Sequence, residues 1–404
     1  MPRQAADDET NRRRFLGYTG AALFGTTALA GCSDENGGEG GNGGGGGGDG
    51  GGDGGAGAVA EVEPLGESVD STAVSWDDLG DLEGHLTVYS GRTPDQIDPV
   101  FEELEDAYEE FTLNRNYADN DVQVNQIIQE GEATPADLFY SQDPGALGAL
   151  ESEGVLQALP NDVVEAVPES YRHPDGFWTG VSGRVRSIQF NAERLADETE
   201  FESGEELPTD IQEYATDERL QGVISTRPNS GTFRGFIQAM VDLEGEEATR
   251  EWVRGMIDNQ DVQLFEGGSD QAEAVNRGGD DDPIVGLGNS YYAARILNED
   301  PDAPIDLAFT ENDAGCLFSV AGVGVMNEVE NPELVAEFTR HLLAEEGQQF
   351  MMDANGEYPV VEGVDYVGEL PDLAEINPPE FDLSEFDTDL QEAQDLLNEE
   401  GMTV

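Results

Sequence analysis

The sequence predicts an α/β fold with two lobes, and three observations lead to this expectation. Short apolar strands alternate with segments of helical periodicity along most of the chain, which is typical of α/β layers with parallel strands. Once a leader and a glycine-rich stretch are set aside, about 340 residues remain, which is too many for one core. Polar turns that follow strands come from both halves of the chain, and a cleft between two lobes would gather them.

The first 31 residues have the layout of an export signal. Arg12 and Arg13 precede a weakly apolar run of small residues, as in twin-arginine (Tat) leaders, and the run ends in Leu-Ala-Gly-Cys at Cys32, which resembles a lipobox. The apolar run is shorter than the roughly 18–20 residues that cross a bilayer. We therefore expect a signal peptide over 1–31, acylation of Cys32, and a protein tethered to the outer face of the cell membrane.

Residues 32–83 are expected to form an acidic, glycine-rich linker. Residues 37–57 are nearly all Gly, and such a segment can neither bury a core nor hold a helix. The remaining chain is divided into a first part of lobe 1 (84–183), lobe 2 (184–318), and a return to lobe 1 with C-terminal helices (319–404).

Periodicity predicts the elements of the globular part in order. Apolar residues spaced three and four apart, as at Ile97, Val100, Phe101 and Leu104, indicate helices, and short apolar runs that end in polar turns indicate strands. Strands are expected within 85–92 and at 121–125, 136–140, 180–190, 223–225, 283–289 and 321–326. Helices are expected at 97–108, 145–154, 233–241, around 252–256, at 332–343 and near 390–397.

The charge balance is extreme and restricts the possible partners. The formal net charge is −70, from 88 acids against 18 bases, and all of the bases are Arg. Such an excess would drive the folded state apart in dilute buffer, but at molar salt the Debye length is about 3 Å and the repulsion is screened. We therefore expect a halophilic protein, and we exclude nucleic acid as a partner because no basic patch can meet phosphates.

No catalytic constellation is recognisable. Cys316 stands alone in an apolar stretch and is expected to be a core residue, and the three His have no metal-ligand spacing. There is no GxSxG elbow and no P-loop. A tethered hydrolase would need a nucleophile and base or a metal cluster, so we expect a binding protein rather than an enzyme.

The pair Tyr291-Tyr292 follows an expected strand and is the sharpest candidate for metal binding. Phenolate is a hard anionic donor that suits Fe(III), and tyrosine, with a pKa near 10, ionises at neutral pH only when a strong cation displaces its proton. The alternative is an ordinary strand end, with one ring in the core and the other on the surface.

Ser230, Gly231 and Thr232 precede an expected helix and form a candidate anion seat, because free N–H groups and hydroxyls gather there. Arg92 and Arg184 are rare bases on polar turns and suit an oxyanion or carboxylate. Simple helix capping and ordinary salt bridges are the alternatives for these residues.

Six blocks in order resemble the periplasmic ferric-ion-binding proteins, the solute receptors of iron(III) ABC importers. The blocks are LTVYSGR, ADLFYSQDPGALGAL, GVSGRVR, PNSGTFRGF, GLGNSYYAAR and NGEYPVV. The resemblance implies a type II periplasmic-binding-protein fold hinged on crossing strands, and delivery of Fe(III) to a permease and its ATPase. It also implies iron ligation by Tyr291 and Tyr292. The anion-binding residues that it implies or that lie on nearby turns are Ser90, Arg92, Gln142, Asp143, Arg184, Ser230, Gly231, Thr232 and Asn289.

The chain also departs from the family pattern. Thr93 and Gln142 stand where several members place a metal-binding His and Glu, and a third Tyr of other members would fall at Phe233 or Phe190. Carbonate, phosphate, citrate, water or Tyr89 would then complete the iron shell. We expect a monomer that acts without catalysis, and the alternative within this fold is a receptor for an oxyanion or organophosphonate without metal.

Overall fold

The computed structural model describes residues 74–361, 363–366, 368, 370–379, 381, 383 and 391–403, all within the unit Ala60–Val404. The Tat motif at Arg12 and Arg13 and the acylation site at Cys32 lie outside these residues and stay predictions. In the part that is described, no helix has the length and apolar character needed to cross a membrane.

One mixed sheet runs through both lobes, in the order β2-β1-β3-β10-β5-β8-β6-β7, with β4 on β10 and β9 on β5. Its strands are β1 Gly84–Ser90, β2 Phe111–Tyr117, β3 Leu138–Ser141, β4 Leu156–Gln157, β5 Trp178–Asn191, β6 Ile224–Thr226, β7 Gln263–Leu264, β8 Val285–Asn289, β9 Ile305–Ala308 and β10 Phe318–Met326. In lobe 1, β1 pairs parallel with β2 and β3, and in lobe 2, β6 pairs parallel with β7 and β8.

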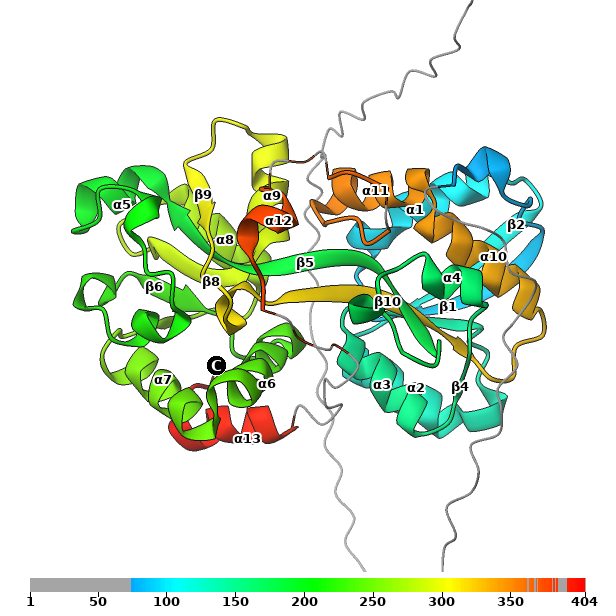
Figure 1. Cartoon of the computed structure of the whole chain (residues 1–404), viewed down its shortest axis with the longest axis horizontal. Coiled ribbons are helices and arrows are strands. Elements are labelled where there is room, and N and C mark those ends of the chain that lie inside the picture. Colours follow the sequence, from blue (N-terminus) through cyan, green and yellow to red (C-terminus); the bar gives the residue numbers. More distant parts are fainter. Residues whose placement is uncertain are drawn as a thin grey trace, which may run out of the picture. The chain divides into compact units, whose positions relative to one another are not determined.

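Helices cover the sheet in both lobes (Figure 1). They are α1 Pro94–Ala107, α2 Asn120–Glu130, α3 Pro144–Ser152, α4 Asn161–Glu165, α5 Ala192–Glu198, α6 Gly231–Glu244, α7 Glu246–Asp258, α8 Gly268–Arg277, α9 Ser290–Glu299, α10 Pro332–Leu343, α11 Glu345–Asn355, α12 Leu373–Ile376 and α13 Gln391–Glu400. The amphipathic helices α1 and α6 bury the apolar residues that predicted them, including Ile97, Phe101 and Phe236.

Strands β5 and β10 cross between the lobes, as Figure 1 shows. The two strands pair antiparallel from Phe318↔Val185 to Gly324↔Trp178, and β5 then continues into lobe 2, where it pairs with β8 and β9. All 14 residues of β5 are buried. The expected two-lobed α/β fold with crossing strands is confirmed, although the crossing strands make the sheet mixed rather than parallel.

The strand expected at 121–125 is wrong. These residues belong to α2, and the strand lies earlier, at β2. Val122 and Val124 suggested a strand because they alternate with polar residues, but Val122 is 53% exposed and Val124 packs against the core from one face of a helix.

The boundary expected between linker and body at residue 84 needs correction, because residues 74–83 are docked on lobe 1. The Trp76 indole Nε1 donates to the carbonyl of His341 at 2.8 Å and its ring stacks on Phe350. The backbone N–H of Gly80 donates to Glu337 at 2.7 Å. The chain is therefore fastened to α10 and α11 before β1 begins.

The C-terminal helix α13 packs on α6 and α7 of lobe 2. Glu400 accepts from Arg250 at 2.8 Å and from Arg254 at 2.5 Å, which fastens the end of α13 to α7. The segment after β10 thus first returns to lobe 1, through α10 and α11, and ends on lobe 2.

Candidate functional site

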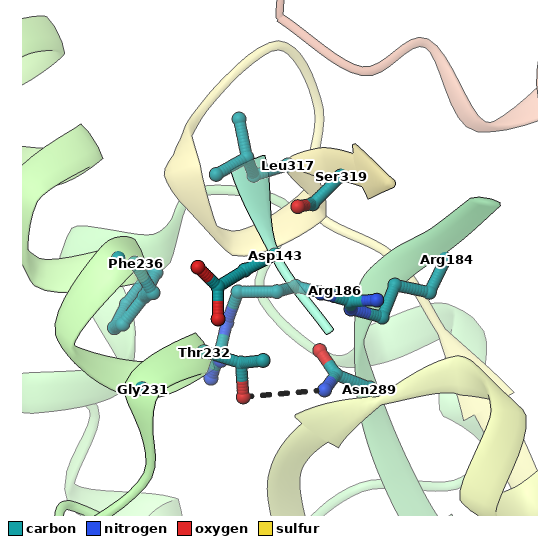
Figure 2. A pocket seen from close by; sticks show the side chains of 10 residues that line it. Asp143, Arg184, Arg186, Gly231, Thr232, Phe236, Asn289, Leu317 and Ser319 are labelled. Carbon is teal, nitrogen blue, oxygen red and sulfur yellow. Dashed lines mark hydrogen bonds between the residues drawn. The ribbon is translucent and has the colours of Figure 1, made fainter. Parts of the chain in front are cut away.

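A pocket lies between the lobes, beside the crossing strands (Figure 2). Lobe 1 contributes Asp143 from the turn between β3 and α3, and β5 contributes Arg184 and Arg186. The rest of the lining comes from the start of α6, the end of β8 and the start of β10, and consists of Gly231, Thr232, Gly235, Phe236, Asn289, Leu317 and Ser319. Five of the predicted anion-binding residues are thereby brought to one place, namely Asp143, Arg184, Gly231, Thr232 and Asn289.

Tyr291 and Tyr292 lie in the first turn of α9, which begins directly after β8. Their rings contact each other, with centroids 4.1 Å apart and planes tilted by 39°. A helix N-terminus carries partial positive charge and favours anionic groups in its first turn. The pair therefore lies at a helix N-terminus, and the predicted strand end is the start of a helix.

Burial raises the pKa of Tyr291 well above the usual value for tyrosine, and neighbouring Tyr292 raises it further, whereas Arg184 acts in the opposite direction. Tyr291 is therefore protonated at neutral pH in the metal-free protein. Arg227 Nη1 donates to the hydroxyl oxygen of Tyr292 at 3.5 Å, a long contact that places a second cation beside the pair.

Gly268, the first residue of α8, has no side chain that would clash with the ring of Tyr292. A Cβ at Gly268 would lie 2.4 Å from Tyr292 Cζ and 2.6 Å from its hydroxyl oxygen, which is closer than any real contact allows. The absence of a side chain at this position thus makes room for the phenol next to Arg227.

The segment at Ser230 is a helix cap facing the pocket. Ser230 Oγ accepts from the N–H of Phe233 at 3.0 Å, and this is the capping role given above as the alternative. Thr232 Oγ1 accepts from Asn289 Nδ2 at 3.4 Å, as Figure 2 shows. The hydroxyl of Thr232 and the amide of Asn289 therefore face the pocket, whereas the side chain of Ser230 caps the N-terminus of α6.

The arginines near the pocket differ from the others in the protein. In residues 74–403 as far as they are described, every arginine lies within 4.0 Å of a carboxylate except Arg184, Arg186 and Arg227. Because the chain has 88 acids, arginines without a carboxylate partner are unusual, and these three are available to bind other negative groups. Arg184 instead donates to the backbone carbonyl of Gln142, across the cleft.

Arg186 is the most isolated of these cations. It is 6% exposed, and its guanidinium lies 4.1 Å from the ring centroid of Phe236 and 5.4 Å from that of Phe233. Its Nη2 is buried and has no hydrogen-bond partner in the described structure. Burial lowers the pKa of Arg186 to about 9, so an incoming anion would relieve an unfavourable buried charge.

Arg92, predicted to bind an anion, instead forms a closed ion pair with Glu357. Arg92 Nη2 and Glu357 Oε2 are 2.9 Å apart, and each side chain is 1% exposed. Ser182 Oγ donates to the same carboxylate at 2.8 Å. Burial alone would lower the pKa of Arg92, but Glu357 overrides this and raises it. Arg92 is therefore already neutralised in this structure, and its anion-binding role stays a prediction.

Breaking this ion pair should destabilise the fold without touching the pocket. Arg92→Met or Glu357→Gln leaves one buried group without its partner, so we expect the free energy of unfolding to fall by about 3–5 kcal/mol. The double variant should recover a large part of that loss. Urea denaturation in molar salt measures the free energy of unfolding of each variant. If the loss in the double variant equalled the sum of the losses in the two single variants, the two side chains would not be coupled.

The remaining predicted residues lie elsewhere. Tyr89 donates its hydroxyl to Glu130 of α2 at 3.2 Å. Ser90 Oγ accepts from the N–H of Arg92 at 2.9 Å and stabilises a buried turn. Thr93 caps α1 with Gln96, and the backbone carbonyl of Gln142 accepts from Arg184. The predicted ligand roles of Tyr89 and Ser90 are not supported.

Sequence reasoning missed Arg186, Arg227 and Glu357. The signal for Arg186 was present, because it lies two residues after Arg184 in a strand and alternate residues share a face. Glu357 gave no such signal, because its contact with Arg92 spans 265 residues. Among the described residues, no group of three or more His, Cys, Asp or Glu side chains could hold a metal ion.

Comparison with known proteins identifies similar chains. The model of the family described as bacterial extracellular solute-binding protein matches residues 133–383. Iron uptake protein A1 of Synechocystis sp. is 30% identical over 290 residues, which cover 69% of this chain and 76% of that protein. The major ferric iron-binding protein of Neisseria meningitidis serogroup A is 26% identical over 328 residues, which cover 78% and 93%.

Solved structures share the fold. Iron-bound HitA from Pseudomonas aeruginosa superposes with a TM-score of 0.71 at 24% identity, covering 78% of this chain and 99% of HitA. The Trichodesmium protein in complex with iron and citrate gives a TM-score of 0.66, also at 24% identity, covering 79% and 100%. The expected periplasmic-binding-protein fold is thereby confirmed.

Proposed function

The chain belongs to the family of bacterial extracellular solute-binding proteins, and from this premise we propose that it binds ferric iron in its interlobe cleft and presents it to the permease of an ABC importer. The observation that carries the proposal is the tyrosine pair at the start of α9, beside Arg184 and Arg227, which have no carboxylate partner among the described residues. The protein acts by binding and release, as a monomer, and catalyses no reaction.

Tyr291 and Tyr292 supply the two anionic ligands. In the metal-free state burial keeps the pKa of Tyr291 high and its hydroxyl protonated, and the charge of Fe(III) would displace that proton. The first turn of α9 and the nearby arginines stabilise the resulting phenolates. Curated relatives carry names that refer to iron, which supports this choice of cargo.

An anion beside the iron would complete the coordination shell. Carbonate, phosphate and citrate each offer hard oxygen donors and could reach Thr232, Asn289 and the unpaired arginines of the pocket. Charge favours such a partner, because Fe(III), two phenolates and three arginines leave a net positive site even with the carboxylate of Asp143 included.

Ion pairs across the cleft support closure of the lobes around the ligand. Arg234 of α6 lies 3.0 Å from Asp121 of α2, and Arg295 of α9 lies 3.4 Å from Asp95 of α1. Both pairs join lobe 2 to lobe 1 and would separate when the hinge opens. Export through the Tat route and tethering through Cys32 would keep the cleft within reach of a membrane permease.

Iron retention tests the proposal. The purified protein in molar KCl, loaded with ferric nitrilotriacetate and passed through a desalting column, should keep one iron per chain. Acidification should release it, with apparent affinity falling about tenfold per pH unit for each proton that returns to a phenolate. Retention of no iron at neutral pH, or retention that is unaffected by acid, would contradict ligation by tyrosine.

A further inference from the structure

A second cavity lies on the opposite face of the crossing strands from the cleft pocket. Ser319 of β10 lines the cleft pocket, whereas Phe318, next to it in the strand, lines this cavity together with Tyr171 and Arg172. Successive side chains of a strand point to opposite faces, so β10 separates the two spaces. This hinge cavity has a volume of about 780 Å³, which is a usual size for a small-molecule site.

Aromatic rings and prolines form the walls of the hinge cavity. The ring centroids of Tyr171 and Phe318 are 4.5 Å apart, and this aromatic pair forms one side. Pro378, Pro379 and Phe381 also line the cavity, from the segment that follows α12. Flat apolar surfaces of this kind suit an aromatic ring, which can stack on them.

Backbone contacts hold both walls of the hinge cavity. Arg172 pairs with Thr179 of β5 in an antiparallel β-bridge, which fixes the segment that carries Tyr171. The N–H of Asn312, in the loop between β9 and β10, donates to the carbonyl of Asn377 at 3.1 Å. Asn377 directly precedes the two prolines, so that wall is fastened to lobe 2 and the other to lobe 1.

Arg172 is a cation with little compensation in this cavity. Its side chain is 16% exposed, and its Nε is buried without a hydrogen-bond partner among the described residues. Its ion pair with Glu169 is 3.9 Å long, which is beyond hydrogen-bond distance, and the side chain of Glu169 is 95% exposed. Such a pair is weak. The planar guanidinium could instead bind a carboxylate through two parallel hydrogen bonds.

We propose that the hinge cavity binds an aromatic monocarboxylate, with the carboxylate on Arg172 and the ring against the aromatic and proline walls. A single negative charge matches the single arginine, and the carboxylate of Glu169 at the same cavity disfavours anions of higher charge. The inference goes beyond the proposed function, since it concerns the face of the hinge away from the cleft and needs no iron.

Calorimetric titration of the metal-free full chain in molar KCl provides the test, with indole-3-acetate as the probe. Indole-3-acetamide has the same ring without the charge, and acetate has the charge without the ring. We expect indole-3-acetate to bind at least about tenfold more tightly than either, because only this probe meets both Arg172 and the walls.

Arg172→Met is the decisive variant, because it removes the charge and keeps an unbranched side chain. Its affinity for indole-3-acetate should fall about tenfold, to that for the amide, while its affinity for the amide stays within about threefold of the parent. Arg219→Met is the matched control, because Arg219 also lies against an aromatic ring, that of Phe201, but outside this cavity. It should bind both probes as the parent does.

Tyr171→Leu tests the aromatic wall separately from the charge. It should weaken the acid and the amide by the same factor, at least about threefold, because the stacking surface is lost and Arg172 remains. Thermal melts in molar KCl check that each variant folds. The ratio of acid to amide affinity in the parent tests the charge even if a variant is unstable.

Several outcomes would overturn the inference. Equal binding of the acid and the amide by the parent, binding of neither, or acetate binding as tightly as indole-3-acetate each contradict it. Unchanged binding by folded Arg172→Met, or an equal loss in Arg219→Met, would place the ligand outside the hinge cavity. A parent that binds indole-3-acetate as expected but retains no iron refutes the ferric proposal and leaves this site standing.

Discussion

The double variant Tyr291→Phe/Tyr292→Phe is expected to lose at least about a hundredfold in affinity for Fe(III) while keeping its fold. Each substitution removes one ionisable oxygen and keeps the ring, so the 4.1 Å ring contact and the packing around α9 should survive. Loss of one anionic ligand should cost more than about 1.4 kcal/mol, which is a factor of ten. Competition with nitrilotriacetate measures the change.

Tyr117→Phe is the matched control for this experiment. Its hydroxyl donates to Asp98 in lobe 1, outside the pocket, so its removal should leave iron affinity unchanged within about twofold. If the double variant bound iron as tightly as the parent, the tyrosine pair would be a packing feature. The receptor for an oxyanion without metal would then be the better account.

The second large effect is the dependence of folding on salt. With a net charge of −70, the protein should lose its cooperative thermal transition when KCl is dialysed from molar concentration to about 0.1 M, as the Debye length grows from about 3 to 10 Å. Circular dichroism melts at several salt concentrations measure this. Return of the transition when KCl is added back would show that the loss is reversible.

The structure suggests which interactions respond to salt. Several carboxylates that pair with arginine are exposed, as in the pairs of Arg194 with Glu198 and Arg234 with Asp121, so added salt weakens these pairs. Screening of the acidic excess must therefore outweigh the loss of surface pairs. A melt that is the same at low and high salt would show that self-repulsion is not what limits stability.

The sequence predicted the fold well where local periodicity and burial agree. The alternating strands and helices and the long crossing strand β5 are set by short-range patterns, and so is the cap at Ser230, which was the alternative to an anion seat. The error at 121–125 arose where one exposed valine imitated strand alternation on a helix. The sequence also favoured parallel strands, whereas β5 and β10 pair antiparallel. Strand direction at the hinge could not be predicted because it depends on long-range topology.

The site was predicted less completely, because its chemistry depends on which charges meet in space. Arg92 and Arg186 look alike in the sequence, yet the first is neutralised by Glu357, whereas the second has no carboxylate within 4.0 Å in the described structure. Pairing of this kind is fixed by tertiary packing between distant segments.

The visible spectrum of the ferric protein tests the central claim most directly. Ligation of Fe(III) by Tyr291 and Tyr292 predicts a phenolate-to-iron charge-transfer band that appears on titration with ferric nitrilotriacetate, saturates at one iron per chain and is absent from the double phenylalanine variant. A colourless complex that nevertheless retains one iron per chain, or a band that persists in the double variant, would contradict ligation by this pair.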